Sequence, residues 1–348
     1  MSGETVFITG ATGYIAQHII KQLLSKGYSV IGSVRSHTKG EQLKELITAH
    51  HQDSTGTAKF DYVIVESLTS FGAFDSILQN HKEISIFIHT ASPIPFPTDN
   101  IERDILNPAI DGTKNVLQSI KKYGNDNIKR VVITSSIAAI KPFGDEQTEL
   151  KIISEKDWNP ITFEQGLDNP IIAYYASKTL AEREVWKFID EQSGNDNQIN
   201  FKLAVVNPSF VFGPQAFGIK DKSAVLRSSA EIVNSILKLK SNDSIPSFVA
   251  SFIDARDVAK AHILAFENNN TIGQRLLLNN EIFTKELIAH LIKKNFPSLD
   301  IPEGDVVKSE EQIANYPWRV DSTKTEKILG FEYIPLEKSI IDTVNQLI

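Results

Sequence analysis

The sequence predicts an α/β fold, a doubly wound parallel sheet flanked by helices and followed by a smaller mixed α/β lobe. An apolar run at residues 5–9 ends at a glycine turn, and an amphipathic helix follows it. Strand-like and helix-like segments then alternate as far as residue 207. The chain has 348 residues, more than one core usually holds, so a second lobe is expected. Together these observations predict a Rossmann-type nucleotide-binding architecture.

The glycine turn lies in T-G-A-T-G-Y-I-A, residues 9–16. Gly10 allows a tight turn, and Gly13 lets the backbone approach a pyrophosphate. The amide groups and the positive dipole end at the helix start then face phosphate groups. The helix is expected to run to Lys26, with Gly27 as a left-handed C-cap. The predicted dinucleotide contacts in this turn are Gly10, Thr12, Gly13, Tyr14 and Ile15.

The second strand, 28–33, ends in S-V-R-S-H-T-K. An enzyme that reads the ribose 2′-hydroxyl of NAD usually has an acid at this strand end, where this chain has Ser33. The cations Arg35 and Lys39 follow, and they attract a 2′-phosphate that a carboxylate would repel. The sequence therefore favours NADP(H). The alternatives are a turn whose glycines serve geometry only, because the G-x-x-G-x-x-A spacing is not G-x-G-x-x-G, and two solvated surface cations.

The remaining elements follow from periodicity and turn residues. A polar segment at 144–170 interrupts the alternation, and segments of this length are often functional or lid-like. We expect a nucleotide-binding domain at 1–207, a substrate-binding lobe at 208–348 and some exchange of segments between them. The further predicted strands are 59–65, 84–89, 130–134 and 201–206 in the sheet and 275–278 in the smaller lobe. The further predicted helices are 101–123 and 174–191 and, in the smaller lobe, 224–239, 257–266 and 285–295.

Ser136, Tyr174 and Lys178 are the catalytic candidates. The Y-x-x-x-K spacing puts Tyr174 and Lys178 one turn apart on the same helix face. Ser136 closes the strand V-V-I-T-S-S, whose carboxyl end faces the same crevice. Carbonyl reduction needs an acid beside the oxygen, and a neighbouring ammonium is expected to lower the pKa of a tyrosine to a useful range. A serine hydroxyl can hydrogen-bond that oxygen. Each residue alone also has an ordinary structural explanation.

The composition is that of an ordinary globular enzyme, with 41% hydrophobic and 23% charged residues. A net charge of −7 gives no indication of a nucleic-acid partner or of an anionic membrane surface. The chain has no cysteine, which excludes thiolate catalysis, and its eight histidines show no H-x-x-x-H pair, so no metal site is expected. No apolar run reaches membrane length, and no signal peptide precedes the first strand. We expect a cytoplasmic monomer or homodimer.

Several further motifs carry a family resemblance. The chain resembles the extended short-chain dehydrogenase/reductases over nearly its full length. Within them it is most similar to the yeast NADPH-dependent methylglyoxal/isovaleraldehyde reductases, used also as ketoreductases, and more distantly to plant dihydroflavonol and cinnamoyl-CoA reductases. The motifs that carry the resemblance are T-G-A-T-G-Y-I-A (9–16), H-T-A-S-P (89–93), D-G-T-K-N-V-L (111–117), V-I-T-S-S (132–136), Y-Y-A-S-K (174–178), E-x-x-W-N-P (155–160), N-P-S-F-V-F-G-P (207–214), F-I-D-A-R-D-V-A (252–259) and K-I-L-G-F (327–331).

The resemblance implies roles for individual residues. Tyr174 is the acid, Lys178 binds the nicotinamide ribose and tunes that tyrosine, and Ser136 is the catalytic serine. Arg35 and Lys39 match the 2′-phosphate clamp. An aspartate that usually touches adenine is replaced here by Ser67, followed by Leu68, which leaves adenine affinity open. The catalytic asparagine of some short-chain enzymes has no secure counterpart among residues 107–115 of this chain. The other implied cofactor contacts are Ser33, Thr90, Ala91, Pro93, Ser135, Pro208, Ser209 and Phe210.

The expected substrate pocket departs from the yeast pattern. Ile137 and Lys141 stand where those relatives have aromatic residues, and Phe210 replaces a tyrosine. Substrate preference is therefore not transferred from them. Phenylalanines are more often core than pocket, so some of the candidates are expected to be packing residues. The candidate pocket residues are Phe96, Ile137, Lys141, Phe143, Phe163, Phe210 and Phe217.

These observations predict an NADPH-dependent carbonyl reductase that converts aldehydes and ketones to alcohols, with Tyr174 as proton donor. Methylglyoxal-like compounds, aliphatic and aryl ketones and keto esters are the expected substrates. Three alternatives remain: a nucleotide-sugar epimerase or dehydratase, a cinnamoyl-CoA or flavonoid-type reductase, and a non-enzymatic NADP-sensing protein. The cations after the second strand argue against the first, and the retained tyrosine, lysine and serine argue against the last.

Overall fold

The computed structural model describes most of the chain and divides it into two compact units. The first unit comprises residues 1–143, 155–207 and 259–276, and the second comprises 144–154, 208–258 and 277–348. No helix in the described ranges is both long and apolar enough to cross a bilayer. The structure describes residues 3–50, 58–92, 97–144, 149–192, 198–219 and 228–348.

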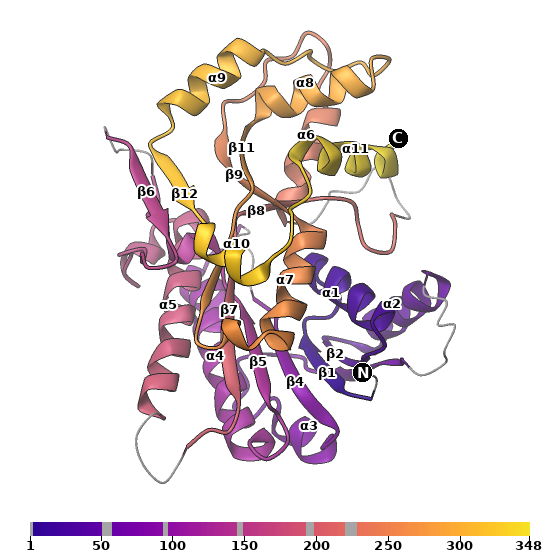
Figure 1. The fold of residues 1–348 in the computed structure, drawn as a ribbon, viewed down its shortest axis with the longest axis vertical. Helices are drawn as coiled ribbons and strands as arrows, with labels where there is room; N and C mark the ends of the chain where they lie inside the picture. Colours follow the sequence, from indigo (N-terminus) through magenta and orange to yellow (C-terminus); the bar gives the residue numbers. More distant parts are fainter. Residues whose placement is uncertain (1–2, 51–57, 93–96, 145–148, 193–197, 220–227) are drawn as a thin grey trace. The chain divides into compact units, whose positions relative to one another are not determined.

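A seven-stranded sheet forms the centre of the first unit (Figure 1). The first strand, β1, pairs in parallel with β2 on one side and β4 on the other, so the winding direction reverses at β1. All five residues of β1 are buried, as expected for a parallel strand with both faces covered. The predicted doubly wound sheet is confirmed. Its strands, in spatial order, are β10 (Arg275–Leu278), β7 (Lys202–Pro208), β5 (Arg130–Thr134), β4 (Ile84–His89), β1 (Thr5–Thr9), β2 (Ser29–Val34) and β3 (Phe60–Ile64).

The helices around this sheet begin and end at recognisable signals. Helix α5 begins at Pro170 because the Asn169 side chain accepts hydrogen bonds from the backbone N–H groups of Ile171 and Ile172, four residues before the predicted start. The predicted helix 101–123 is α4 with a π-helical segment at each end, Glu102–Leu106 and Ile120–Gly124. These helices are α1 (Tyr14–Ser25), α2 (His37–His50), α3 (Asp75–Asn80), α4 (Asn107–Ser119), α5 (Pro170–Glu191) and α7 (Ala255–Glu267).

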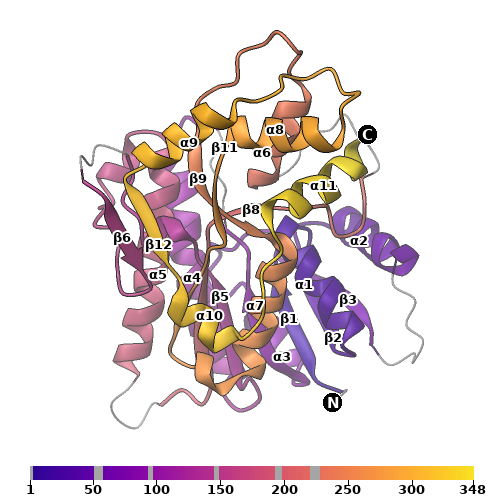
Figure 2. The same ribbon diagram turned by 45° about the horizontal axis from the view of Figure 1, so that its top comes forward.

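The second unit is built on two small sheets and an aromatic core. The rings of Phe212, Phe252 and Phe283 are completely buried, and Phe212 stacks on Phe252 with 5.3 Å between ring centroids. The three-stranded sheet has the order β11 (Glu281–Thr284), β9 (Val249–Asp254) and β8 (Phe210–Phe212). A separate parallel pair joins β6 (Lys151–Ser154) to β12 (Trp318–Asp321), which lie side by side in Figure 2. A smaller mixed lobe in the C-terminal part is therefore confirmed.

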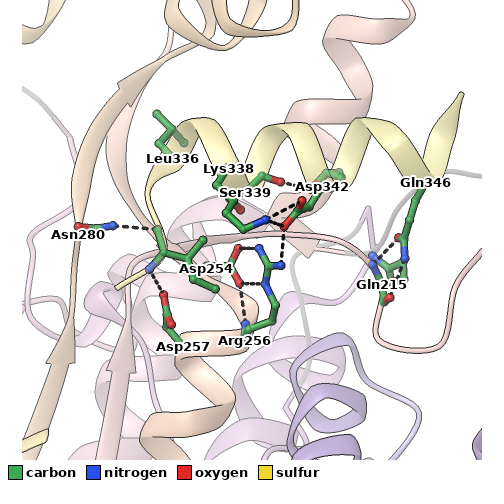
Figure 3. A network of polar contacts seen from close by, with 12 residues as sticks. Gln215, Asp254, Arg256, Asp257, Asn280, Leu336, Lys338, Ser339, Asp342 and Gln346 are labelled. Carbon is green, nitrogen blue, oxygen red and sulfur yellow. Dashed lines mark hydrogen bonds and ion pairs between the residues drawn. The ribbon is translucent and has the colours of Figure 1, made fainter. Parts of the chain in front are cut away.

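The C-terminal helix contributes to the core of this unit and to its polar network. Leu336, Ile340 and Val344 of α11 lie in the same hydrophobic cluster as the phenylalanines. Figure 3 shows its polar side, where Asp342 binds the guanidinium of Arg256 and Gln346 binds the backbone of Gln215. The helices of this unit are α6 (Glu231–Leu237), α8 (Lys285–Asn295), α9 (Val306–Asn315), α10 (Thr323–Leu329) and α11 (Leu336–Leu347).

Three predicted segments differ from the structure. Residues 259–276, expected in the smaller lobe, belong to the first unit because Val205 N–H donates to Gln274 and Gly273 N–H donates to Leu203. The polar segment 144–170 contains the strand β6, which the sequence did not predict because its partner β12 lies far along the chain. Only part of the predicted helix 224–239 lies within the described residues, where a 3₁₀ turn precedes α6.

Candidate active site

The turn after β1 has the backbone that its sequence predicts. Gly10 has φ +65°, and a Cβ atom there would lie 3.0 Å from the Cβ of Ala91. Gly13 N–H donates to the carbonyl of Gly10 at 2.8 Å, and Gly13 is the N-cap of α1. At the other end, α1 ends at Ser25 with Lys26 as its C-cap, and Gly27 just after it has the left-handed φ of +86°. Both ends of this helix therefore match the prediction.

The amino end of α1 fits an anionic group. No acidic residue lies in its first turn, and no side chain caps it at Gly13. The positive end of the helix dipole therefore meets no negative side chain of its own helix. The turn is fixed from the side as well, because the Gln17 side chain donates to the carbonyl of Thr12 at 2.9 Å. These features fit the pyrophosphate of a dinucleotide, the group expected from the motif.

The end of β2 supports this turn and presents cations beside it. The Ser33 hydroxyl accepts from Gly10 N–H at 3.0 Å and is buried, so this side chain holds the turn from within. Arg35 and Lys39 are exposed just beyond the strand. In the part of the chain that the structure describes, neither cation has an ion pair. Exposed cations at this strand end are compatible with a 2′-phosphate, and that contact stays a prediction.

A buried histidine, which the sequence reasoning missed, organises the end of β4. Thr9 Oγ1 accepts from the N–H groups of Thr90 at 3.1 Å and Ala91 at 3.0 Å. The same hydroxyl lies 2.8 Å from His89 Nδ1, to which it donates. Burial lowers the pKa of His89 to about 3, so the ring is neutral. Thr90 and Ala91 are thereby held beside Gly10, as the cofactor-site prediction requires.

The predicted adenine contacts lie in a loop after β3. Ser67 is exposed, and its hydroxyl lies 2.8 Å from that of Thr69. The carbonyl of Leu68 accepts from the Asn115 side-chain amide at 2.9 Å. Asn115 also donates to Ser70, so this asparagine of α4 supports the loop. Contact of Ser67 and Leu68 with adenine stays a prediction.

The catalytic candidates come together in the first unit. Tyr174 and Lys178 lie one turn apart on α5, and the Lys178 Nζ atom is 5.8 Å from the centre of the Tyr174 ring. Ser136 follows β5 in extended conformation and caps a 3₁₀ turn, with its hydroxyl accepting from Ala138 N–H at 3.1 Å. The Ser136 and Tyr174 side chains share a hydrogen bond. One hydroxyl, one phenol and one ammonium therefore converge.

Burial controls the protonation of this cluster. Burial raises the pKa of Tyr174, and the Ser136 hydrogen bond lowers it by less, so the phenol keeps its proton at neutral pH. The net shift is therefore upward, opposite to the net lowering expected from the sequence. Burial instead lowers the pKa of Lys178 to about 8, against an opposing effect of Glu182. Lys178 is only 8% exposed, yet still charged near pH 7.

The expected pocket residues of the first unit follow Ser136 or flank α5. Ile137 is buried in the 3₁₀ turn, and Lys141 is half-buried just after it. Phe143 is 45% exposed and meets the Tyr175 ring edge-on at 5.1 Å. Phe163 packs on a cluster that contains Leu106 and Ala176, so its contacts are those of a packing residue. Contact of these four residues with substrate stays a prediction.

The remaining candidates belong to the second unit. Ser209 N–H donates to the carbonyl of Leu278 at 3.0 Å, while its buried hydroxyl has no partner among the described residues. Such a hydroxyl fits a polar group of a ligand. Phe210 packs edge-on against Phe248 and Phe283, and Phe217 is buried. Pro208 ends β7 and is buried. Pro93 and Phe96 lie outside the described residues.

A buried ion pair beneath the catalytic cluster escaped the sequence reasoning. Glu182 lies one turn beyond Lys178 and contacts Arg275, with 2.6 Å between Arg275 Nε and Glu182 Oε1. Ser135, predicted as a cofactor contact, donates its hydroxyl to Glu182 Oε2 at 2.6 Å. The signal was the spacing of Tyr174, Lys178 and Glu182, each four residues apart. The described ranges contain no group of three or more histidine, aspartate or glutamate side chains placed to hold a metal ion.

Comparison with known proteins adds independent findings. The model of the NAD dependent epimerase/dehydratase family matches residues 6–279. The NADPH-dependent methylglyoxal reductase of Saccharomyces cerevisiae is 41% identical over 347 residues, which cover 99% of this chain and 98% of that protein. A cinnamoyl-CoA reductase of Medicago truncatula is 32% identical, with 99% of this chain and 96% of that protein covered.

Solved structures agree. The crystal structure of Gre2 from Candida albicans in complex with NADPH superposes with a TM-score of 0.91 at 48% identity, covering 99% of this chain and 98% of that one. Yeast methylglyoxal/isovaleraldehyde reductase Gre2, also crystallised with NADPH, gives a TM-score of 0.89 at 39% identity, covering 99% of this chain and 98% of that one. These proteins are similar to the present chain along its full length.

Proposed function

Because the chain belongs to the NAD dependent epimerase/dehydratase family, within the extended short-chain dehydrogenase/reductases, we propose that it is an NADPH-dependent carbonyl reductase. The predicted family is confirmed. The observation that carries the function is the convergence of Ser136, Tyr174 and Lys178 beside a turn that fits a dinucleotide. The family name alone covers epimerases and dehydratases as well, so the cofactor preference decides between them.

NADP(H) is the cofactor. The relatives that are 41% and 45% identical are named for NADPH dependence, and two similar proteins were crystallised with it. On this chain, Arg35 and Lys39 would hold the 2′-phosphate, while Gly10 and Gly13 would admit the pyrophosphate. When bound, NADPH supplies the hydride that reduces the carbonyl carbon.

The residues of this chain handle the proton. Tyr174 donates its phenolic proton to the carbonyl oxygen as negative charge develops there. The Ser136 hydroxyl gives a hydrogen bond to the same oxygen. Lys178, charged below its pKa of about 8, stabilises the phenolate that remains until solvent returns a proton. The product is an alcohol, secondary from a ketone and primary from an aldehyde.

The substrates are small carbonyl compounds, with methylglyoxal-like compounds, aliphatic and aryl ketones and keto esters as the class to test first. The names of the similar reductases and of a ketoreductase from Aspergillus niger support this choice. The proposed enzyme acts in the cytoplasm as a monomer or homodimer, and a chain without cysteine fits a reducing compartment.

The first test is a direct assay. NADPH oxidation, followed by absorbance, is measured with methylglyoxal, isovaleraldehyde, 2,5-hexanedione, an aryl ketone and a β-keto ester, and each assay is repeated with NADH. We expect turnover that is much faster with NADPH. Absence of turnover with the whole panel, by protein that binds NADPH, would contradict the proposed substrate class.

The sharper test is Tyr174→Phe. Because this change removes only the acidic hydroxyl, kcat is expected to fall by roughly 10²–10⁴-fold while NADPH binding, measured by fluorescence titration, is retained. Tyr123→Phe is the matched control, since Tyr123 packs on the distant core of the first unit. Near-normal turnover by Tyr174→Phe would overturn the assignment of the acid.

A further inference from the structure

The mechanism proposed above gives no role to Glu182, a buried acid close to Lys178 in the sequence. Glu182 is 1% exposed on α5, one turn beyond Lys178. An unpaired carboxylate at such a position would be strongly unfavourable, so its partners indicate why it is there. Its neighbours are the residue that follows β5, one residue each of β7 and β10, and one of α5 itself.

Both oxygens of this carboxylate are fully used. Oε2 accepts from the Ser135 hydroxyl at 2.6 Å and from the Asn207 amide at 2.7 Å. Oε1 accepts from Arg275 Nε at 2.6 Å and from the Trp186 indole at 3.2 Å. Every bond is donated to Glu182, which is the pattern of an ionised carboxylate.

These bonds fix the backbone that carries Ser136. Ser135 is the residue before it, and Asn207 also donates to the carbonyl of Ser136 at 3.2 Å. The Ser136 backbone is therefore held in two ways, through its own carbonyl by Asn207 and through the side chain of the preceding residue, Ser135, by Glu182. A rotation of this strand end would break hydrogen bonds to a buried charge. Breaking such bonds costs more free energy than breaking hydrogen bonds between neutral groups.

Arg275 extends the same structure to the segment after β6. Its Nη1 donates to the carbonyls of Glu155 and Asp157, and its guanidinium lies 3.9 Å from the centre of the Trp158 ring. Asn159 continues the connection, because its side-chain amide donates to Ala138 at 2.9 Å. The W-N motif of the sequence thus packs against the 3₁₀ turn that Ser136 caps.

We propose that Glu182 is a positioning residue: with Arg275 it fixes the strand end that carries Ser136, and as a carboxylate one turn beyond Lys178 on α5 it favours the charged form of that lysine. The inference rests on the proposed reductase activity. It adds to that function a fourth residue, one that acts through Ser136 and Lys178 without touching substrate.

The charged and titratable groups around Lys178 determine in which direction its pKa shifts when Glu182 is changed. Tyr174 and Glu182 face it from α5, and His89 faces it from β4 as a neutral ring. Arg275, on β10, is paired with Glu182. Burial lowers the pKa of Lys178 to about 8, and Glu182 raises it. Removing a negative charge lowers the pKa of every proton-binding neighbour, so Lys178 and Tyr174 shift in the same direction.

The test is Glu182→Gln, which keeps the size of the side chain and removes its charge. The pH profile of kcat for reduction falls on its alkaline side as the Tyr174–Lys178 pair loses a proton. We expect this limb to move toward neutral pH by about one unit in Glu182→Gln. Glu182→Asp, which keeps the charge, should restore the wild-type limb. Glu184→Gln is the control. Glu184 lies on another face of α5, where it pairs with Lys114 of α4.

A second readout needs no turnover. Lysine labelled with ¹³C at Cε is titrated by NMR, with the Lys178 signal assigned by its loss in Lys178→Arg. We expect the Lys178 pKa to fall in Glu182→Gln, even if the substrate panel proves wrong for the wild type. Inactive wild-type protein would therefore contradict the proposed function, whereas the titration would still test the role of Glu182.

Folding failure leaves the proposal testable. If Glu182→Gln does not fold because Arg275 loses its counterion, Glu182→Gln with Arg275→Met removes both buried charges together. A smaller fall in the Lys178 pKa is expected in the double variant, because the lost positive charge of Arg275 acts in the opposite direction. A uniform loss of kcat, with the alkaline limb and the Lys178 pKa at their wild-type values, would show that Glu182 serves only the fold, and would overturn the proposal.

Discussion

Among the residues that the structure describes, two buried carboxylates bind arginine, one in each unit, and they differ in what lies beside them. Glu182 in the first unit is bonded to Ser135 and Asn207, which adjoin the catalytic serine. Asp254 in the second unit accepts three hydrogen bonds from Arg256, whose guanidinium also binds Asp342 on α11 (Figure 3). The first pair therefore connects to the reacting groups, and the second connects two elements of a core.

The role of an ion pair is therefore decided by the residues beside it and not by the chemistry of the pair itself. The two pairs have similar shortest N–O distances, 2.8 Å for Asp254 to Arg256 and 2.6 Å for Glu182 to Arg275. The Arg275 side chain is 9% exposed and that of Arg256 is 27% exposed. We expect changes at the first pair to alter the pH profile, and changes at the second to alter stability alone.

Asp254→Asn should give the largest effect on stability in this comparison. It leaves the Arg256 guanidinium half-buried with only Asp342 as counterion, so the free energy of unfolding should fall by about 3 kcal/mol. Denaturant unfolding measures this fall, and kcat with its alkaline limb should remain at the wild-type value in the folded enzyme. A shifted limb would mean that the two pairs are not separate in function.

Arg35→Ala examines a cation of a third kind, exposed and without an ion pair in the described ranges. Since it has no structural partner to lose, stability should stay within about 0.5 kcal/mol of the wild type. The KM for NADPH should rise by roughly tenfold, and the KM for NADH should change little, because only NADPH carries the 2′-phosphate. Equal changes in both KM values would make Arg35 an ordinary surface cation.

Asp342→Asn should give the smallest effect, and a pH-dependent one. Burial raises the pKa of Asp342, but hydrogen bonds from Arg256 and Lys338 outweigh it and hold this pKa below its usual value. A carboxyl whose folded pKa is lowered stabilises the protein above about pH 4, and this stability is lost as the pH falls through the folded pKa.

The group is partly open to solvent, so the contribution should be at most about 1 kcal/mol. Urea unfolding of the wild type and of Asp342→Asn should differ at pH 7 and converge at low pH. A difference that is the same at both pH values would place the effect in packing and not in charge.

Local signals made the first unit predictable. The strand β1, the turn at Gly10 and the helix α1 depend on residues within one short stretch, and each was found where it was predicted. The parallel, doubly wound sheet followed from alternation, because parallel strands joined by helices allow few arrangements. Ser136, Tyr174 and Lys178 could be proposed together because two of them share a helix and the third ends a strand.

Features that depend on contacts between distant parts of the chain could not be predicted from the sequence. Glu182 looked like any helix acid, since its partners Ser135, Asn207 and Arg275 lie 47, 25 and 93 residues away. The pairing of β6 with β12 was hidden for the same reason. The pKa of Tyr174 was predicted in the wrong direction because a sequence reveals a neighbouring lysine but not the degree of burial.

The late position of Arg275 in the chain has a consequence for biosynthesis. A chain emerges from the ribosome at about 5–20 residues per second, so the 93 residues that separate Glu182 from Arg275 take roughly 5–20 s to follow. During that interval the catalytic helix carries an acid whose counterion does not yet exist. The nascent first unit can form its central strands early, but the active site closes around Glu182 only when most of the protein has been synthesised.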